Sequence, residues 1–84
     1  MRIKFEAVDK NGKPHNRASV SRLYSHCVVI HFAAQPPSKF WPKGIVACSH
    51  AEWAASRELA ERNASRWRKK PDVEAIEILE ARQV

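Results

Sequence analysis

The alternation of apolar and polar residues predicts a β-hairpin at the start of the chain. Residues 1–7 alternate apolar and polar side chains, the period-two pattern of a half-buried strand. Residues 9–12 form a turn, in which Asn11-Gly12 is the strongest short signal for a hairpin. Residues 13–21 follow as a weaker second strand, and Pro14 confines its start to a sheet edge or a loop.

The most strand-like segment covers residues 23–33 (LYSHCVVIHFA). It is rich in Val, Ile and aromatic residues, which favour strands. Both of its faces are largely apolar, so we predict that it lies near the centre of the sheet. One face carries Tyr24, His26, Val28, Ile30 and Phe32, and the other carries Leu23, Cys27, Val29 and His31.

Residues 49–70 predict one long amphipathic helix. Ser49 and Glu52 have capping-box spacing, and Pro71 ends the helix because the residue before a proline is disfavoured in the α conformation. Cations in the last turn, Arg66 to Lys70, complement the helix dipole. At 100° per residue, one stripe of the helix carries Trp53, Ser56, Leu59, Ala60, Asn63, Ala64 and Trp67.

Three further segments complete the pattern. Residues 35–43 (QPPSKFWPK) form a loop, because three prolines exclude regular structure, and residues 44–48 form a short strand that leads into the helix. Residues 74–83 predict a last strand, with a short helix capped by Asp72 as the alternative.

The predicted order is therefore β-β-β-β-α-β, which indicates an α+β fold. We expect a small, mainly antiparallel sheet of four to five strands packed on one long amphipathic helix. Trp53, Leu59 and Trp67 would cover the inner face of this sheet. Eighty-four residues support one domain, 1–84, with one small core and the loop at 35–43.

Charge is distributed unevenly along the chain, whose net charge is +6. Residues 1–50 carry +6, residues 51–70 carry +3 and residues 71–84 carry −3. This balance favours polyanions or acidic protein surfaces as partners. We find no signal peptide and no apolar run long enough to span a membrane, so we expect a cytoplasmic protein without membrane contact.

The residues that could carry chemistry lack the usual spacings. His26, Cys27, His31, Cys48 and His50 include zinc-ligating atoms, but there is no C-x-x-C pair and no helical H-x-x-x-H. Along a strand, Cys27 and His31 would lie about 13 Å apart. We therefore predict no metal site and no cofactor, and we expect both cysteines to be small buried hydrophobic residues. The alternative is a zinc-stabilised module in which Cys48 and His50 bind the ion, with Cys27 joining from a neighbouring strand.

Enzymatic activity is not predicted. The chain has only two glycines and no glycine-rich phosphate loop. Its C-terminal carboxylates resemble a solvated surface rather than a catalytic pair. The one cysteine with an identifiable activating feature is Cys48, which precedes the N-terminus of the predicted helix.

Aromatic and basic residues meet in the proline-rich loop, which we predict to be the contact surface. Lys39, Phe40, Trp41 and Lys43 place stackable rings beside positive charges, as single-strand binders do, and Trp and Arg also anchor protein interfaces. The alternative is that Phe40 and Trp41 fold back over the core. A second basic patch is predicted on the helix at Arg62, Arg66 and Lys69.

Three segments carry a resemblance to a known group of proteins: residues 24–30 (YSHCVVI), the alanine-rich segment that starts at Ser49, and residues 73–78 (VEAIEI). The chain resembles small bacteriophage-encoded proteins of unknown function in which a Tyr-x-His-x-Val-Val strand, a short strand, a helix and a Val-Glu-x-Val strand follow in order. The resemblance covers about two-thirds of the chain, and the loop at 39–43 has no counterpart in that pattern.

The resemblance implies a phage accessory protein that binds a host component, and anti-CRISPR inhibitors are one such class. It implies no catalytic residue. We therefore predict a non-enzymatic, phage-derived binding protein that engages a host protein or nucleoprotein. Direct binding of nucleic acid through the basic and aromatic surface is the alternative.

Overall fold

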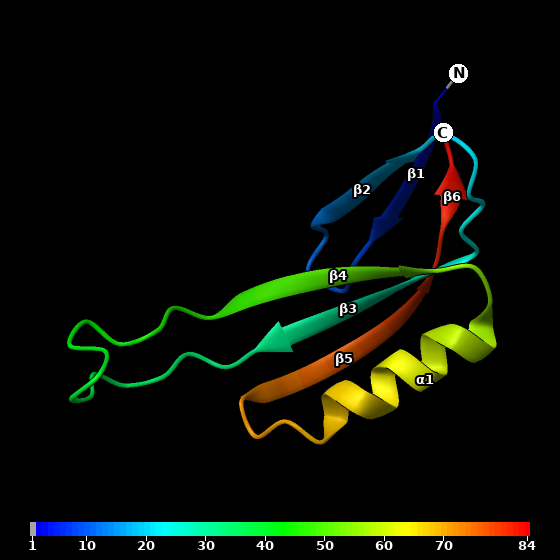
Figure 1. Cartoon of the computed structure of the whole chain (residues 1–84). Coiled ribbons are helices and arrows are strands. Elements are labelled where there is room, and N and C mark those ends of the chain that lie inside the picture. Colours follow the sequence, from blue (N-terminus) through cyan, green and yellow to red (C-terminus); the bar gives the residue numbers. More distant parts are fainter. Residues whose placement is uncertain (1) are drawn as a thin grey trace.

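The computed structural model describes residues 2–84 and shows three layers (Figure 1). A central sheet lies between a helix on one face and an N-terminal sheet on the other. Both sheets are antiparallel and three-stranded. The central sheet has the strand order β4 (Cys48–Ala54), β3 (His26–Phe32), β5 (Val73–Glu80); the N-terminal sheet has the order β2 (Pro14–Ser19), β1 (Ile3–Val8), β6 (Arg82–Gln83); the helix is α1 (Arg57–Arg68).

Strand β3 is the centre of the molecule, which confirms the prediction from its two apolar faces. Val28 and Ile30 point toward α1, where they pack with Ala60 and Ala64 of the helix. Cys27 and Val29 point toward the N-terminal sheet, on the side where Ala7 of β1 packs. The four β3 residues are fully buried because each face of the strand is covered by a different layer.

The N-terminal hairpin is confirmed, whereas the single last strand predicted at 74–83 is divided into β5 and β6, which belong to different sheets. β1 and β2 pair around a turn in which the Gly12 amide donates to the Asp9 carbonyl at 2.9 Å, and Gly12 has a φ of 77°. Residues 73–80 form β5, so the alternative of a short helix there is wrong. Ile76 and Ile78 of β5 pack on the helix side of the sheet.

The predicted helix at 49–70 is wrong in its first third. Residues 48–54 form β4, and α1 begins only at Arg57 with Ser56 as its N-cap. The Ser56 hydroxyl accepts a hydrogen bond from the Leu59 amide at 3.2 Å, so the cap lies seven residues beyond the predicted Ser49. Pairing with β3 makes residues 48–54 a strand instead of a helix. The backbone N–H and C=O groups along one edge of β3 find their hydrogen-bond partners in this segment.

The expected single sheet is replaced by two three-stranded sheets, and the helix is shorter than predicted. Residues 44–47 do not form the predicted strand; only Ile45 makes an isolated bridge, with Gln35. Of the three residues expected to cover the sheet from the helix, Trp67 packs on the helix-side core. Trp53 instead belongs to β4 and faces the N-terminal sheet, and Leu59 is exposed.

The molecule is elongated, with principal extents of 47 × 23 × 21 Å, because the β3–β4 connection projects far beyond the sheet (Figure 1). No helix in the described part of the chain combines the length and hydropathy needed to cross a membrane.

Candidate functional site

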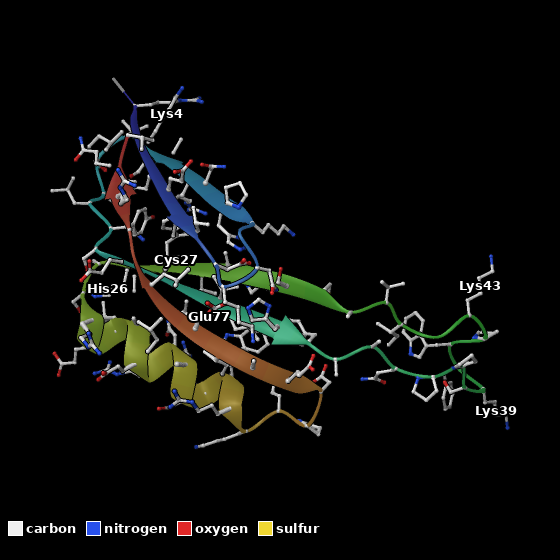
Figure 2. All side chains as sticks on the ribbon, turned by 180° about the vertical axis from the view of Figure 1, so that it is seen from behind. Lys4, His26, Cys27, Lys39, Lys43 and Glu77 are labelled. Atoms are coloured by element: carbon white, nitrogen blue, oxygen red, sulfur yellow. The ribbon has the colours of Figure 1, made fainter. Side chains whose placement is uncertain are left out.

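The β3–β4 connection, residues 33–47, forms a projecting arm with the predicted loop at its end (Figures 1 and 2). The outgoing and returning segments of the arm are joined by a bridge between Gln35 and Ile45, whose backbone groups exchange hydrogen bonds of 2.8 and 3.0 Å. Beyond this bridge lie the prolines, which cannot donate backbone hydrogen bonds to a ladder. The arm therefore ends in a loop rather than in a longer hairpin.

Short-range hydrogen bonds give the end of the arm a defined shape. The amides of Ser38 and Gly44 both donate to the Trp41 carbonyl at 2.9 Å, and the Trp41 amide donates to the Ser38 hydroxyl at 3.2 Å. Gly44 has a φ of 75°, and a Cβ at this position would lie 2.6 Å from the Gln35 carbonyl oxygen. Glycine is therefore required where the chain turns back against Gln35.

The aromatic residues of the arm face solvent. Phe40 is 85% exposed and Trp41 is 60% exposed, so the alternative in which they fold back over the core is wrong. Lys39 and Lys43 are exposed beside them, and Figure 2 labels both at the outer end of the arm. Exposed aromatic residues of this size are uncommon, and here two adjacent ones occupy the most remote point of the fold.

The second predicted patch is separate from the arm. Arg62, Arg66 and Lys69 are exposed on or just after α1, which runs alongside β5, whereas the end of the arm projects far beyond the helix (Figure 1). The Arg66 guanidinium donates to the Asn63 side-chain carbonyl at 2.8 Å. The structure therefore does not combine the two predicted patches into one surface.

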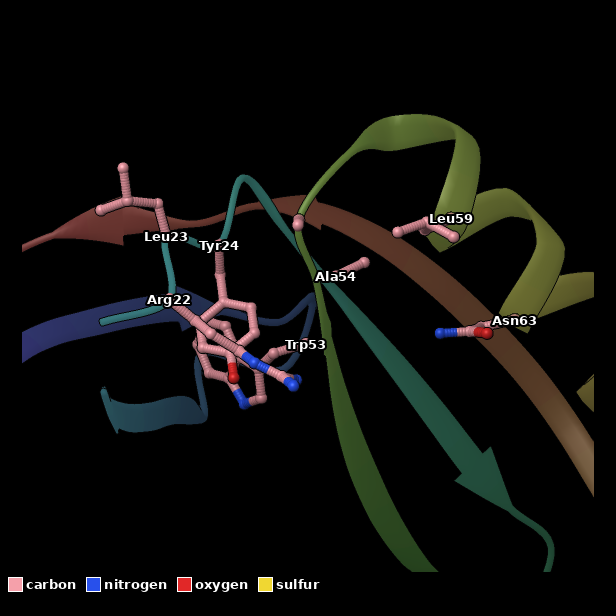
Figure 3. A pocket seen from close by; sticks show the side chains of 8 residues that line it. Arg22, Leu23, Tyr24, Trp53, Ala54, Leu59 and Asn63 are labelled. Atoms are coloured by element: carbon pink, nitrogen blue, oxygen red, sulfur yellow. The ribbon is translucent and has the colours of Figure 1, made fainter. Parts of the chain in front are cut away.

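A groove that sequence analysis missed lies between the β2–β3 connection, β4 and α1; Figure 3 shows the part lined by Arg22, Tyr24 and Trp53, and an adjoining part adds Arg17 and Arg66. The Arg17 guanidinium lies 5.8 Å from the centre of the Tyr24 ring, and that ring lies 6.2 Å from the Trp53 ring. Arg66 lines the same groove from the helix. No local signal could have indicated it, since its residues come from four separate parts of the chain. Its lining includes Arg17, Arg22, Tyr24, Trp53, Asn63 and Arg66.

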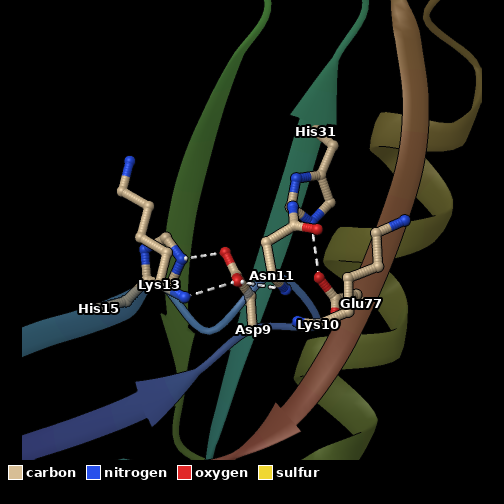
Figure 4. A network of polar contacts seen from close by, with 7 residues as sticks. All are labelled: Asp9, Lys10, Asn11, Lys13, His15, His31 and Glu77. Atoms are coloured by element: carbon tan, nitrogen blue, oxygen red, sulfur yellow. Dashed lines mark hydrogen bonds and ion pairs between the residues drawn. The ribbon is translucent and has the colours of Figure 1, made fainter.

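A polar cluster, also missed, joins the N-terminal hairpin to the central sheet (Figure 4). The His15 ring shares a 3.0 Å hydrogen bond with Asp9, and the His31 ring shares a 2.5 Å hydrogen bond with Glu77. The two pairs come together because the Lys10 amide, next to Asp9, donates to Glu77 at 2.9 Å. These four side chains are at most 16% exposed, so the cluster is largely shielded from water.

Asp9 is the most strongly perturbed carboxyl group of the cluster. The hydrogen bond from His15 lowers its pKa from 3.8 to about 2, with help from the amides of Lys13 and Asn11, against the opposing effect of burial. The backbone amides of Lys13 and Asn11 both donate hydrogen bonds to Asp9 Oδ1, at 3.0 and 2.9 Å. Asp9 is therefore an ionised group that organises the turn between β1 and β2.

The cysteines differ from one another, contrary to the prediction that both are buried. Cys27 is buried, and this burial raises the pKa of its thiol to about 12, so it is a poor nucleophile. Cys48 is exposed, and it pairs with Phe32 on the helix side of the central sheet, whereas Cys27 faces the N-terminal sheet. Within residues 2–84 they therefore do not form the zinc site considered as an alternative.

Comparison with known protein families, with curated proteins and with solved structures gave no match to this chain.

Proposed function

We propose that this protein is a non-enzymatic binding protein that docks on a protein partner through the end of its β3–β4 arm. The observation that carries the proposal is the exposure of Phe40 and Trp41, at 85% and 60%, at the outer end of a projecting arm. Aromatic side chains of this kind anchor protein interfaces when a partner provides a pocket for them.

The energetics favour a docking role for this pair. Covering the exposed parts of the two rings would remove on the order of 200 Å² of apolar surface from water. At about 25 cal/mol/Å², this is worth ~5 kcal/mol before the costs of association. The hydrogen bonds around Trp41 and the tight turn at Gly44 reduce those costs, because the loop is ordered before it binds.

The charges indicate an acidic partner surface. Lys39 and Lys43 flank the rings, and the whole chain carries a net charge of +6. Opposite charges at the rim of an interface raise the association rate and select among partners. The resemblance of the sequence to phage accessory proteins supports a bacterial host protein or nucleoprotein as the partner.

Capture from a bacterial lysate tests the proposal when it is run with nuclease and with matched variants. The Phe40→Ala, Trp41→Ala double variant should lose a discrete set of nuclease-resistant proteins that the wild type retains. The control is the Val20→Ala, Val84→Ala double variant, which removes residues that are 74% and 66% exposed but lie outside both the arm and the groove. Equal capture by both variants would contradict docking through the arm, and thermal melting would verify that both variants are folded.

Direct binding of nucleic acid is the second candidate, and the basic groove favours it. Three arginines, Arg17, Arg22 and Arg66, line it together with two aromatic rings and a single carboxylate, a combination that suits phosphates and stacked bases. Fluorescence anisotropy with a single-stranded oligonucleotide should then show affinity that falls steeply with salt. Arg17→Ala and Arg22→Ala should weaken this binding, whereas Phe40→Ala should not. Binding that persists unchanged in the arginine variants would exclude the groove as the site.

A further inference from the structure

We propose that Asp9, His31 and Glu77 form a binding site for one divalent transition-metal ion, of the Zn²⁺ class, that fastens the N-terminal hairpin to the central sheet (Figure 4). The site is independent of the docking function proposed for the arm. It differs from the cysteine-containing set considered from the sequence, since none of its ligands is a cysteine.

The geometry of the three side chains suits one ion. Asp9 lies in the β1–β2 turn, His31 in β3 and Glu77 in β5, so three elements converge on one point. One ligand atom from each residue lies within 4.8 Å of the other two. Ligand atoms around a tetrahedral Zn²⁺ ion are about 3.3 Å apart, given metal–ligand bonds of about 2.0 Å. Side-chain adjustments of about 1 Å would therefore bring all three ligands onto an ion.

The charge of the cluster also favours a cation. The side chains of Asp9 and Glu77 are only 1% and 16% exposed. Across residues 2–84, neither carboxylate forms an ion pair with a Lys or Arg side chain; their partners are His15 and His31. Two shielded carboxylates require compensating positive charge, and a divalent cation supplies both charges at once.

Neighbouring groups already orient the carboxylate ligands. Asp9 accepts two backbone amides on Oδ1 and His15 on Oδ2, and Glu77 accepts the Lys10 amide on Oε1. Each carboxylate oxygen has two lone pairs, so Asp9 Oδ2 and Glu77 Oε2 retain acceptor capacity for an ion. Hydrogen bonds of this kind to ligating carboxylates are typical of metal sites and tune their affinity.

The site is open to solvent at His31. His31 lines a surface groove together with Asn11, Lys13, Cys48 and Ser49, so an ion can reach its ring from solvent. The Nε2 atom of His31, which now contacts Glu77, is the atom that would bind the ion. One imidazole and two carboxylates leave a fourth coordination position for water. This nitrogen and oxygen set should bind Zn²⁺ more tightly than Mn²⁺, in keeping with the Irving–Williams order.

Calorimetric titration of the metal-free protein with Zn²⁺ tests the site, with Co²⁺ absorption as a second readout. The wild type should bind one ion per chain. His31→Gln and Glu77→Gln should each weaken Zn²⁺ binding more than about 100-fold, and His15→Gln should weaken it about 10- to 100-fold because it only orients Asp9. Glu77→Gln keeps the size and an acceptor oxygen of the side chain, so it also covers the case in which His31→Gln fails to fold.

The controls separate this site from the other ligating groups of the chain. His26 belongs to the same strand as His31, but its ring contacts Ser25 and not the carboxylates of the cluster. The His26→Gln variant should therefore bind Zn²⁺ with the affinity of the wild type. The Cys48→Ser, His50→Gln double variant should also retain binding. The proposal is overturned if the wild type binds no Zn²⁺, if Glu77→Gln binds it normally, or if the Cys48, His50 variant abolishes binding.

Discussion

The two glycines of the chain allow a sharp test of how the arm is built. Both have left-handed backbones, with φ of 77° at Gly12 and 75° at Gly44. A Cβ added at Gly12 would have no atom within 4 Å, whereas a Cβ at Gly44 would lie 2.6 Å from the Gln35 oxygen and 3.2 Å from the Pro37 nitrogen. Alanine therefore imposes the same backbone strain at both positions and a clash at only one.

The magnitudes follow from these contacts. A left-handed alanine costs about 1–2 kcal/mol, so Gly12→Ala should lower the free energy of unfolding by roughly that amount. At Gly44 the chain can relieve both the strain and the clash by breaking the two backbone hydrogen bonds between Gln35 and Ile45. Each of these hydrogen bonds contributes about 0.5–1.5 kcal/mol to stability. Gly44→Ala should therefore lower the free energy of unfolding by no more than about 3 kcal/mol, and the arm should open.

Urea denaturation and amide hydrogen exchange together provide the assay. Gly44→Ala should expose the amides of Gln35 and Ile45 to rapid exchange while the amides of β3 stay protected. Gly12→Ala should leave exchange at Gln35 and Ile45 unchanged. Slow exchange of both arm amides in Gly44→Ala would refute the argument that this glycine closes the arm. The same variant should also lose the partner captured through Phe40 and Trp41.

Three further predictions concern the helix cap, the carboxyl group of the turn and the thiols. Ser56→Ala should lower the free energy of unfolding by about 1 kcal/mol in urea denaturation, because Ser56 caps α1. Ser49→Ala should change it by no more than about 0.5 kcal/mol. A larger effect of Ser49→Ala than of Ser56→Ala would instead support the longer helix predicted from the sequence. Because the pKa of Asp9 is lowered from 3.8 to about 2 in the folded state, the unfolded state binds more protons between these values. The stability that Asp9 contributes is therefore present above about pH 4 and lost as the pH falls through about 2, and circular dichroism in EDTA should show this loss in the wild type but not in Asp9→Asn. A thiol reagent should label exposed Cys48 in the native protein, and buried Cys27 only after unfolding, as mass spectrometry would show; native labelling of Cys27 would contradict its burial.

The sequence alone determined the elements whose pattern has one structural solution. A strand with apolar residues on both faces needs a layer on each side, and β3 has both. Asn11-Gly12 permits the positive φ of a hairpin turn, and β1 and β2 pair around it. The prolines of the arm exclude regular structure wherever they occur, so the position of the loop at 35–43 was also predictable from local chemistry.

Tertiary structure decided the segment at 48–54, which has residues suited to a helix and a plausible helix cap at Ser49. An isolated helix gains only local hydrogen bonds, whereas the same residues in β4 satisfy one whole side of β3 and place Trp53 and Ala54 on opposite faces of the sheet. The gain from pairing with a buried strand outweighs a weak local preference.

The sites divide in the same way. The sequence left open whether Phe40 and Trp41 face solvent or fold back over the core, but their place in a loop was predictable, because the neighbouring prolines set it. The cluster of Asp9, His31 and Glu77 was not predictable, because its members belong to a turn and two strands, and His31 and Glu77 are 46 positions apart in the sequence. Only the packing of the N-terminal hairpin against the central sheet brings them together, and local sequence patterns carry no information about that contact.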